Sequence, residues 1–151
     1  MLGGDRGRRD AAAMAAAAGK AIGCSADEVL VASTGVIGEP LPMAKIRAGA
    51  VLAQQELKAN GFKRAAEAIR TTDTFAKYAS TTVVVNRKQV TISGIAKGSG
   101  MIEPNMATML SFITTDANVS PAFLRGALKR VADQTYNCVK IDGEGSTSDT
   151  V

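Results

Sequence analysis

The sequence predicts an α/β protein of the α+β type, in which helices pack on antiparallel or mixed sheets. Helical spacing or a high alanine content marks three early segments, at 10–22, 43–60 and 62–70. After residue 80, two β-rich runs, 81–85 and 89–95, flank a polar tripeptide as the strands of a hairpin do. A hairpin pairs its strands antiparallel, which disfavours a strictly alternating parallel fold.

The composition fits one domain and excludes several classes of protein. The 151 residues suffice for about one domain, and a hydrophobic content of 46% can fill its core. The net charge of +4 comes from scattered Lys and Arg, and the cluster Arg6, Arg8 and Arg9 is interpreted as a solvated chain end. Aromatic residues make up 4%, so no nucleic-acid partner is expected. No apolar run reaches the roughly 18 residues of a membrane span.

The absence of histidine narrows the chemistry. Ser-His-Asp and Cys-His nucleophile systems and the usual zinc sites need His, so no metal is expected. Cys24 and Cys138 stand far apart without CxxC spacing, which favours free thiols in a reducing compartment. The opening residues lack the apolar segment of a signal peptide, and we expect a cytoplasmic protein.

The first elements follow from propensity and capping signals. Alanine has the highest helix propensity, so 10–22 should form a helix that ends at Gly23. Ser25 and Glu28 have the spacing of a capping box, which indicates one helical turn before a short buried strand over 28–32. Two further helices should cover 43–60 and 62–70.

The later elements alternate strands with a capped helix. Beyond the hairpin, a strand is predicted over 110–114 and another over 138–141. Between them, Ser120-Pro121 begins a helix that runs to about residue 135. Two apolar faces should be buried: Phe62, Ala65, Ala66 and Ile69 on one helix, and Phe123, Leu124, Leu128 and Val131 on the other.

Four polar clusters lie at the ends of these elements. Ser33-Thr34-Gly35 is either an ordinary turn or a site that directs backbone N–H groups at a ligand, as an oxyanion hole requires. The hydroxyls of 71–74 either cap backbone ends or bind a zwitterionic ligand. The segment 97–100 resembles a phosphate-cradling loop only loosely and lacks the P-loop spacing, and Lys97 among its glycines can equally hold a substrate carboxylate. The acidic segment 142–149 lacks the spacing of a calcium-binding EF-hand loop.

The segment 97–110 is the most informative part of the chain. A glycine-rich turn and the small Ala107 precede Thr108, and an apolar run from Met109 follows. Spacing alone favours a loop before an ordinary, β-prone threonine. The alternative is a self-cleaving Ala107–Thr108 bond. Cleavage would make Thr108 a new N-terminus, with its hydroxyl as nucleophile and its own α-amine as base.

Several long motifs, in order, resemble the ornithine acetyltransferases, the bifunctional glutamate N-acetyltransferases of cyclic arginine biosynthesis. The motifs cover 33–42, 72–74, 94–102, 104–110 and 114–117. The resemblance extends over most of the chain from about Arg8, whereas 1–5 differs from the family pattern. It implies an αββα-like sandwich that is incomplete here, because both ends of the chain look cut.

The resemblance implies self-cleavage between Ala107 and Thr108. The products would be 1–107, the end of an α chain, and 108–151, the start of a β chain. The two chains would stay together as a hetero-oligomer with the family segments that are missing here. Glu103 occupies a position that often holds a small residue, which would alter the cleavage.

The resemblance also assigns the site residues and the reaction. Thr108 would carry the acetyl group, Thr34 and Gly35 would form the oxyanion hole, and Thr74 and Lys97 would bind substrate. The acetyl group would pass from N-acetylornithine to glutamate, with acetyl-coenzyme A as a further donor and no metal or bound cofactor. Two alternatives stay open: an inactive fragment or non-catalytic partner of the same fold, and a related amidase or aminopeptidase with a self-generated threonine nucleophile.

Overall fold

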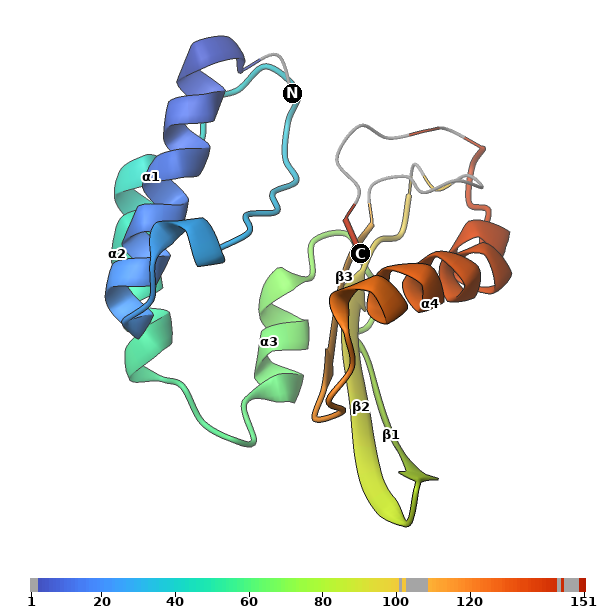
Figure 1. Ribbon diagram of the computed structural model, residues 1–151. Helices are drawn as coiled ribbons and strands as arrows, with labels where there is room; N and C mark the ends of the chain where they lie inside the picture. The colour runs from blue at the N-terminus through green and yellow to red at the C-terminus, as the bar shows by residue number, and fades with distance from the viewer. Residues whose placement is uncertain (1–2, 101, 103–108, 144, 146–149) are drawn as a thin grey trace. The chain divides into compact units, whose positions relative to one another are not determined.

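The computed structural model describes residues 3–100, 102, 109–143, 145 and 150–151. The chain folds as two compact units, Met1–Ala59 and Asn60–Val151. Helices and an antiparallel three-stranded sheet make up the described residues (Figure 1). The α+β class is therefore confirmed. The second sheet of an αββα sandwich is not among these residues.

The first unit is helical. Helix α1 (Gly4–Ile22) packs against α2 (Met43–Gln55) and contacts the 3₁₀ turn η1 (Ala26–Glu28). The helix α1 begins earlier than the alanine run indicates, at Gly4, and α2 ends before the predicted 60, at Gln55. Both helices otherwise occupy the predicted segments.

Two glycines shape the end of α1. Gly23 ends the helix as predicted, and its φ of 82° lies in the left-handed region that glycine adopts freely. A Cβ at Gly19 would lie 2.8 Å from the carbonyl oxygen of Cys24. Only glycine therefore fits at Gly19, where the chain folds back closely over the last turn of the helix.

The chain after α1 keeps the predicted cap but not the predicted strand. Ser25 and Glu28 form the capping box, in which the Ser25 N–H donates to the Glu28 carboxylate at 2.9 Å. The strand expected over 28–32 is wrong. Val29 has extended dihedrals, but the segment pairs with no described strand and Leu30 is 98% exposed. β-Prone residues favour extended backbone, whereas a strand also requires a partner.

The second unit is built on the antiparallel sheet β1-β2-β3. Its strands are β1 (Lys77–Val85), β2 (Lys88–Lys97) and β3 (Leu110–Thr115). Helix α3 (Phe62–Ile69) packs against β1 and β2 and buries Ala66 completely (Figure 1). The predicted hairpin, the third strand and the helix over 62–70 are confirmed.

The hairpin closes through a two-residue turn at Asn86 and Arg87. Both residues have positive φ, 50° and 64°, and Val85 pairs directly with Lys88. Positive φ at both central positions is the signature of a type I′ turn, whose twist matches that of the flanking strands. The turn thereby sets the register of the whole β1–β2 pair.

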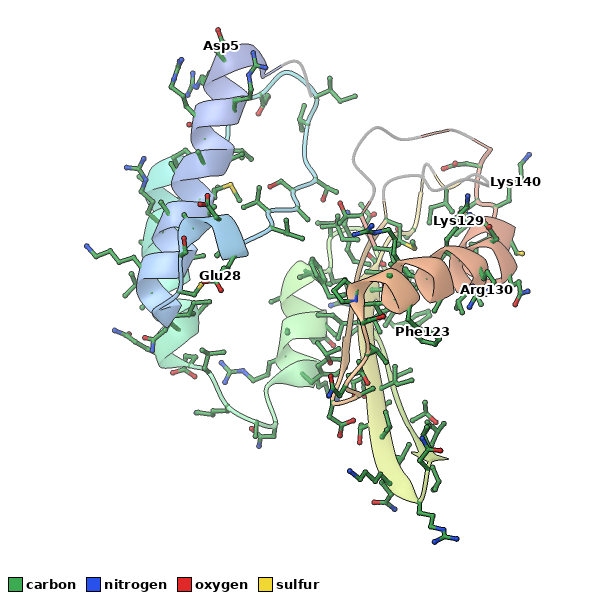
Figure 2. All side chains as sticks on the ribbon, in the orientation of Figure 1. Asp5, Glu28, Phe123, Lys129, Arg130 and Lys140 are labelled. Carbon is green, nitrogen blue, oxygen red and sulfur yellow. The ribbon has the colours of Figure 1, made fainter. Side chains whose placement is uncertain are left out.

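Helix α4 (Pro121–Gln134) begins as predicted. The Ser120 hydroxyl accepts the Phe123 N–H at 3.2 Å, and Pro121 occupies the first turn. The predicted burial of its apolar face is wrong, because Phe123 is 59% and Val131 51% exposed (Figure 2). Helical spacing gathers apolar residues on one face, but burial needs a surface against it, and the described residues do not cover this one.

The chain after α4 contains less strand than expected. The predicted strand over 138–141 is wrong at its start, because Tyr136–Cys138 is a 3₁₀ turn, η2. Only Ile141 pairs there, exchanging hydrogen bonds of 3.1 and 2.6 Å with Ile102. Cys24 and Cys138 are both free thiols, as predicted.

Candidate functional site

The predicted site residues are distributed over both units. Thr34 and Gly35 belong to the first unit, in irregular chain between η1 and α2, and Thr74 and Lys97 belong to the second. Ala107 and Thr108, the predicted cleavage pair, lie outside the described residues. The geometry of the candidate site therefore rests on the segments around Thr74 and Lys97.

In the segment that follows Thr34 and Gly35, the residue with a positive φ is Gly38. Gly38 has a φ of 84°, in a turn closed by the Glu39 N–H and the Val36 carbonyl at 3.3 Å. The φ of Gly35 is not positive, and a Cβ there would meet nothing within 4 Å. The local backbone thus requires glycine at 38 rather than at 35, and the oxyanion role of Gly35 stays a prediction.

Lys97 is buried at the end of β2. Its exposed fraction is 3%, and it stands opposite Leu110 of β3 in the sheet register. Ile95, two residues earlier on the same face, is also buried. Lysine is rarely buried so completely unless its ammonium group is paired, so Lys97 belongs to the packed interior at the end of β2 and not to the solvated surface.

The segments that carry Thr74 and Lys97 are joined to each other. The Gly98 N–H donates to Asp73 Oδ1 at 2.7 Å, and the Lys77 ammonium group donates to the same oxygen. Beside this bond, the hydroxyls of Thr72, which precedes Asp73, and of Ser99, which follows Gly98, share a hydrogen bond of 2.8 Å. Two hydrogen bonds thus connect 72–73 with 98–99.

Asp73 keeps its charge in this buried position. Burial by itself would raise its pKa, but the hydrogen bonds from Lys77 and the Gly98 N–H, with the charge of Lys77, outweigh burial and hold the pKa below its ordinary value. The carboxylate is therefore ionised at neutral pH. Its second oxygen, Oδ2, is buried and accepts no hydrogen bond from the described residues.

Sequence reasoning did not find this connection. The pattern at 71–74 groups Asp73 with hydroxyls, and the glycines after Lys97 indicate a turn or a ligand-binding loop, so neither pattern points to the other. Gly98 has a φ of 147°, a conformation that side chains disfavour, and its N–H reaches Asp73 from there. The sequence signal for part of this arrangement is the spacing of Asp73 and Lys77, which stand four residues apart and form an ion pair.

The backbone is held on both sides of the predicted cleavage position. Before it, Ile102 pairs with Ile141 in an antiparallel bridge. After it, the Met109 carbonyl accepts the Thr150 N–H at 3.0 Å, and the Ser111 N–H donates to the Thr150 carbonyl at 2.9 Å. The last part of the chain thus anchors both flanks of this segment.

Two features are absent from the part of the chain that the structure describes. No group of three or more His, Cys, Asp or Glu side chains there could hold a metal ion. No helix there is both long and apolar enough to cross a membrane.

Known proteins match the whole chain. The ArgJ family model matches residues 1–151, so the expectation that 1–5 departs from the family is wrong. The arginine biosynthesis bifunctional protein ArgJ of Symbiobacterium thermophilum is 51% identical over 148 residues, 98% of this chain and 37% of that protein. The protein of the same name from Bradyrhizobium diazoefficiens is 49% identical, over 98% of this chain and 36% of that protein. The chain thus spans little more than a third of these relatives.

A solved structure agrees with these matches. The crystal structure of arginine biosynthesis bifunctional protein ArgJ from Bacillus halodurans superposes with a TM-score of 0.62 at 44% sequence identity. The match covers 70% of this chain and 56% of that chain. Because the family model spans every residue and the relatives are about half identical, the chain belongs to the ArgJ family.

Proposed function

We propose that the chain forms part of a cytoplasmic acetyltransferase that moves the acetyl group of N-acetylornithine to glutamate, with Thr108 as nucleophile. Membership of the ArgJ family carries the proposal. The relatives are named bifunctional proteins of arginine biosynthesis, which fits a second activity with acetyl-coenzyme A as donor. Both activities would need only small-molecule substrates and no metal or bound cofactor.

Thr108 becomes the nucleophile by breaking the peptide bond that precedes it. Its hydroxyl oxygen attacks the Ala107 carbonyl carbon, the C–N bond breaks, and an ester replaces the amide. Water then hydrolyses the ester, which yields the Ala107 carboxylate and restores the Thr108 hydroxyl. The freed α-amine lies beside that hydroxyl and acts as its base. The two products are 1–107 and the piece that begins at 108.

Chain lengths support this cleavage. The match with the solved ArgJ chain covers 70% of the 151 residues, which is about 106 residues. These residues are 56% of the solved chain, so that chain has about 189 residues. Dividing 148 by 37% gives about 400 residues for the Symbiobacterium thermophilum protein. A solved chain of about half that length is expected if the precursor has been cut.

The transfer then runs through one acetyl-threonine. The Thr108 hydroxyl attacks the acetyl carbonyl of N-acetylornithine, the C–N bond breaks, and ornithine leaves with the proton. The amine of glutamate next attacks the acetyl ester, and Thr108 regains its proton. Donors at Thr34 and Gly35 stabilise the oxyanion, each worth about 3–4 kcal/mol. Lys97 binds the α-carboxylate of each amino acid, with Thr74 beside it.

The intact mass of the whole protein, purified and denatured, tests both steps. Wild type should give two masses that sum to the precursor plus one water, cut at Ala107–Thr108. Incubation with N-acetylornithine should add one acetyl group to the piece that begins with Thr108. The variant Thr108→Ala should stay uncut and unacetylated, whereas Thr82→Ala, at an exposed threonine of β1, should behave as wild type.

Two results would contradict the proposal. Cleavage or acetylation of Thr108→Ala would exclude Thr108 as the nucleophile. A cut wild-type protein that releases acetate but forms no N-acetylglutamate would instead favour the amidase alternative.

A further inference from the structure

Asp73 lies between the two segments that the proposed function uses. Its side chain is 1% exposed, and its Oδ1 accepts the Gly98 N–H at 2.7 Å as well as the Lys77 ammonium group. Asp73 directly precedes Thr74 in the chain, and Gly98 directly follows Lys97. One carboxylate oxygen thus connects the backbone neighbours of both candidate substrate-binding residues.

We propose that Asp73 is a positioning residue that fixes Lys97 and Thr74 relative to each other for substrate binding. This inference rests on the proposed function. The bond to the Gly98 N–H holds the backbone where β2 ends, and so sets the direction in which the Lys97 side chain leaves the sheet. The hydrogen bond between Thr72 and Ser99 joins the residue before Asp73 to the residue after Gly98, so it limits rotation about the first bond.

Asp73 contributes to stability, but at a cost that an exposed carboxylate avoids. Burying a carboxylate costs desolvation free energy, which a partly exposed partner such as Lys77 must offset. The second oxygen, Asp73 Oδ2, is buried as well. Asp116 shows the less costly arrangement, since it accepts the Thr91 N–H of β2 at 2.7 Å on the exposed surface. An aspartate can therefore hold β2 without being buried.

Steady-state kinetics of the whole protein, with N-acetylornithine and glutamate, test the inference. Asp73→Ala should raise KM for both amino acids by on the order of a hundredfold, because Lys97 is misplaced, and should change kcat far less. Asp73→Asn keeps an oxygen that can accept the Gly98 N–H and should recover part of the loss. The matched control Asp116→Asn removes the same charge from the exposed site and should leave both parameters unchanged.

A structural readout accompanies the kinetics. Hydrogen exchange of the Gly98 amide should be faster in Asp73→Ala than in wild type and normal in Asp116→Asn. Faster exchange with unchanged KM would make Asp73 purely structural and overturn the inference. If Asp73→Ala does not fold, Asp73→Asn decides by the same comparison of KM.

The activity of the wild-type protein distinguishes failure of the proposed function from failure of the inference about Asp73. A wild type that transfers no acetyl group would overturn the proposed function, and the role of Asp73 in substrate binding with it. An active wild type whose KM is unchanged in the folded Asp73 variants would overturn the inference about Asp73 alone.

Discussion

The charge of Asp73 depends on two donors of different kinds. Lys77 contributes an ammonium group at the end of a long side chain that is 33% exposed, whereas Gly98 contributes a backbone N–H directly after β2. Hydrogen bonds to a charged group contribute about 1.5–3 kcal/mol each in typical cases. The Gly98 bond is the one that transmits position, because its donor is backbone that directly follows β2 and not the end of a long side chain.

The lowered pKa of Asp73 predicts sensitivity to acid. A carboxyl whose pKa is lower in the folded than in the unfolded protein stabilises the fold above the unfolded value, about 3.9. That stabilisation is lost as the pH falls through the folded pKa. Urea denaturation should show wild type more stable than Asp73→Asn by about 2 kcal/mol near pH 7. The difference should shrink below about pH 4.

The matched aspartate supplies the control for this pH dependence. Asp116→Asn removes the same charge at an exposed position, where the carboxylate accepts the Thr91 N–H, and its stability is measured at the same two pH values. A stability difference between wild type and Asp73→Asn that is equal at pH 3 and pH 7 would contradict a lowered pKa in the folded protein.

At the scale of elements, the β1–β2 turn carries local strain. Arg87 has a φ of 64°, where a side chain costs roughly 1–2 kcal/mol that glycine does not pay. Arg87→Gly should therefore raise the free energy of unfolding by about 1 kcal/mol, part of the gain being offset by the freer unfolded chain. Thermal or urea unfolding measures the change.

A neighbouring residue makes the turn test specific. Lys88→Gly, one residue later and inside β2, should lower the free energy of unfolding by about 0.5–1 kcal/mol, because glycine weakens a strand. If both glycine variants changed stability in the same direction, strain at Arg87 would not be the cause.

The sequence predicts correctly those features that depend on a few neighbouring residues. The cap at Ser120, the stop at Gly23 and the hairpin around Asn86 each depend on a short local pattern, and each is present. The strand over 28–32 and the burial of Phe123 failed because both require a partner surface distant in sequence. Local composition does not encode that partner.

The same limit applies to the candidate site. The family motifs located Thr74 and Lys97, but the bond that joins their segments links Asp73 to Gly98, 25 residues away. Its donor is a backbone N–H, which every residue except proline possesses, so no residue type announces the pairing. The pairing follows from the fold, in which the end of β2 lies beside the residues that precede β1.

At the scale of the whole molecule, the β2–β3 pair spans the predicted cleavage position. Every registered pair, from Ile92–Thr115 to Lys97–Leu110, joins a residue before Ala107 to a residue after Thr108. The hydrogen bonds of this ladder do not involve the 107–108 peptide bond. Cleavage would leave them in place, and the two pieces should co-elute in native gel filtration.

Cleavage would also make refolding a different kind of reaction from the first folding of the precursor. Before the cut, β3 finds β2 within one chain, and closing the connecting segment costs entropy that does not depend on concentration. After the cut, the same pairing is an encounter between two molecules.

Cleaved wild type diluted from denaturant should therefore regain structure at a rate that rises with protein concentration, whereas uncut Thr108→Ala should not. Equal, concentration-independent rates would contradict this, and stopped-flow refolding at several concentrations measures them. The protein would fold easily once, as a precursor, and only slowly again in dilute solution.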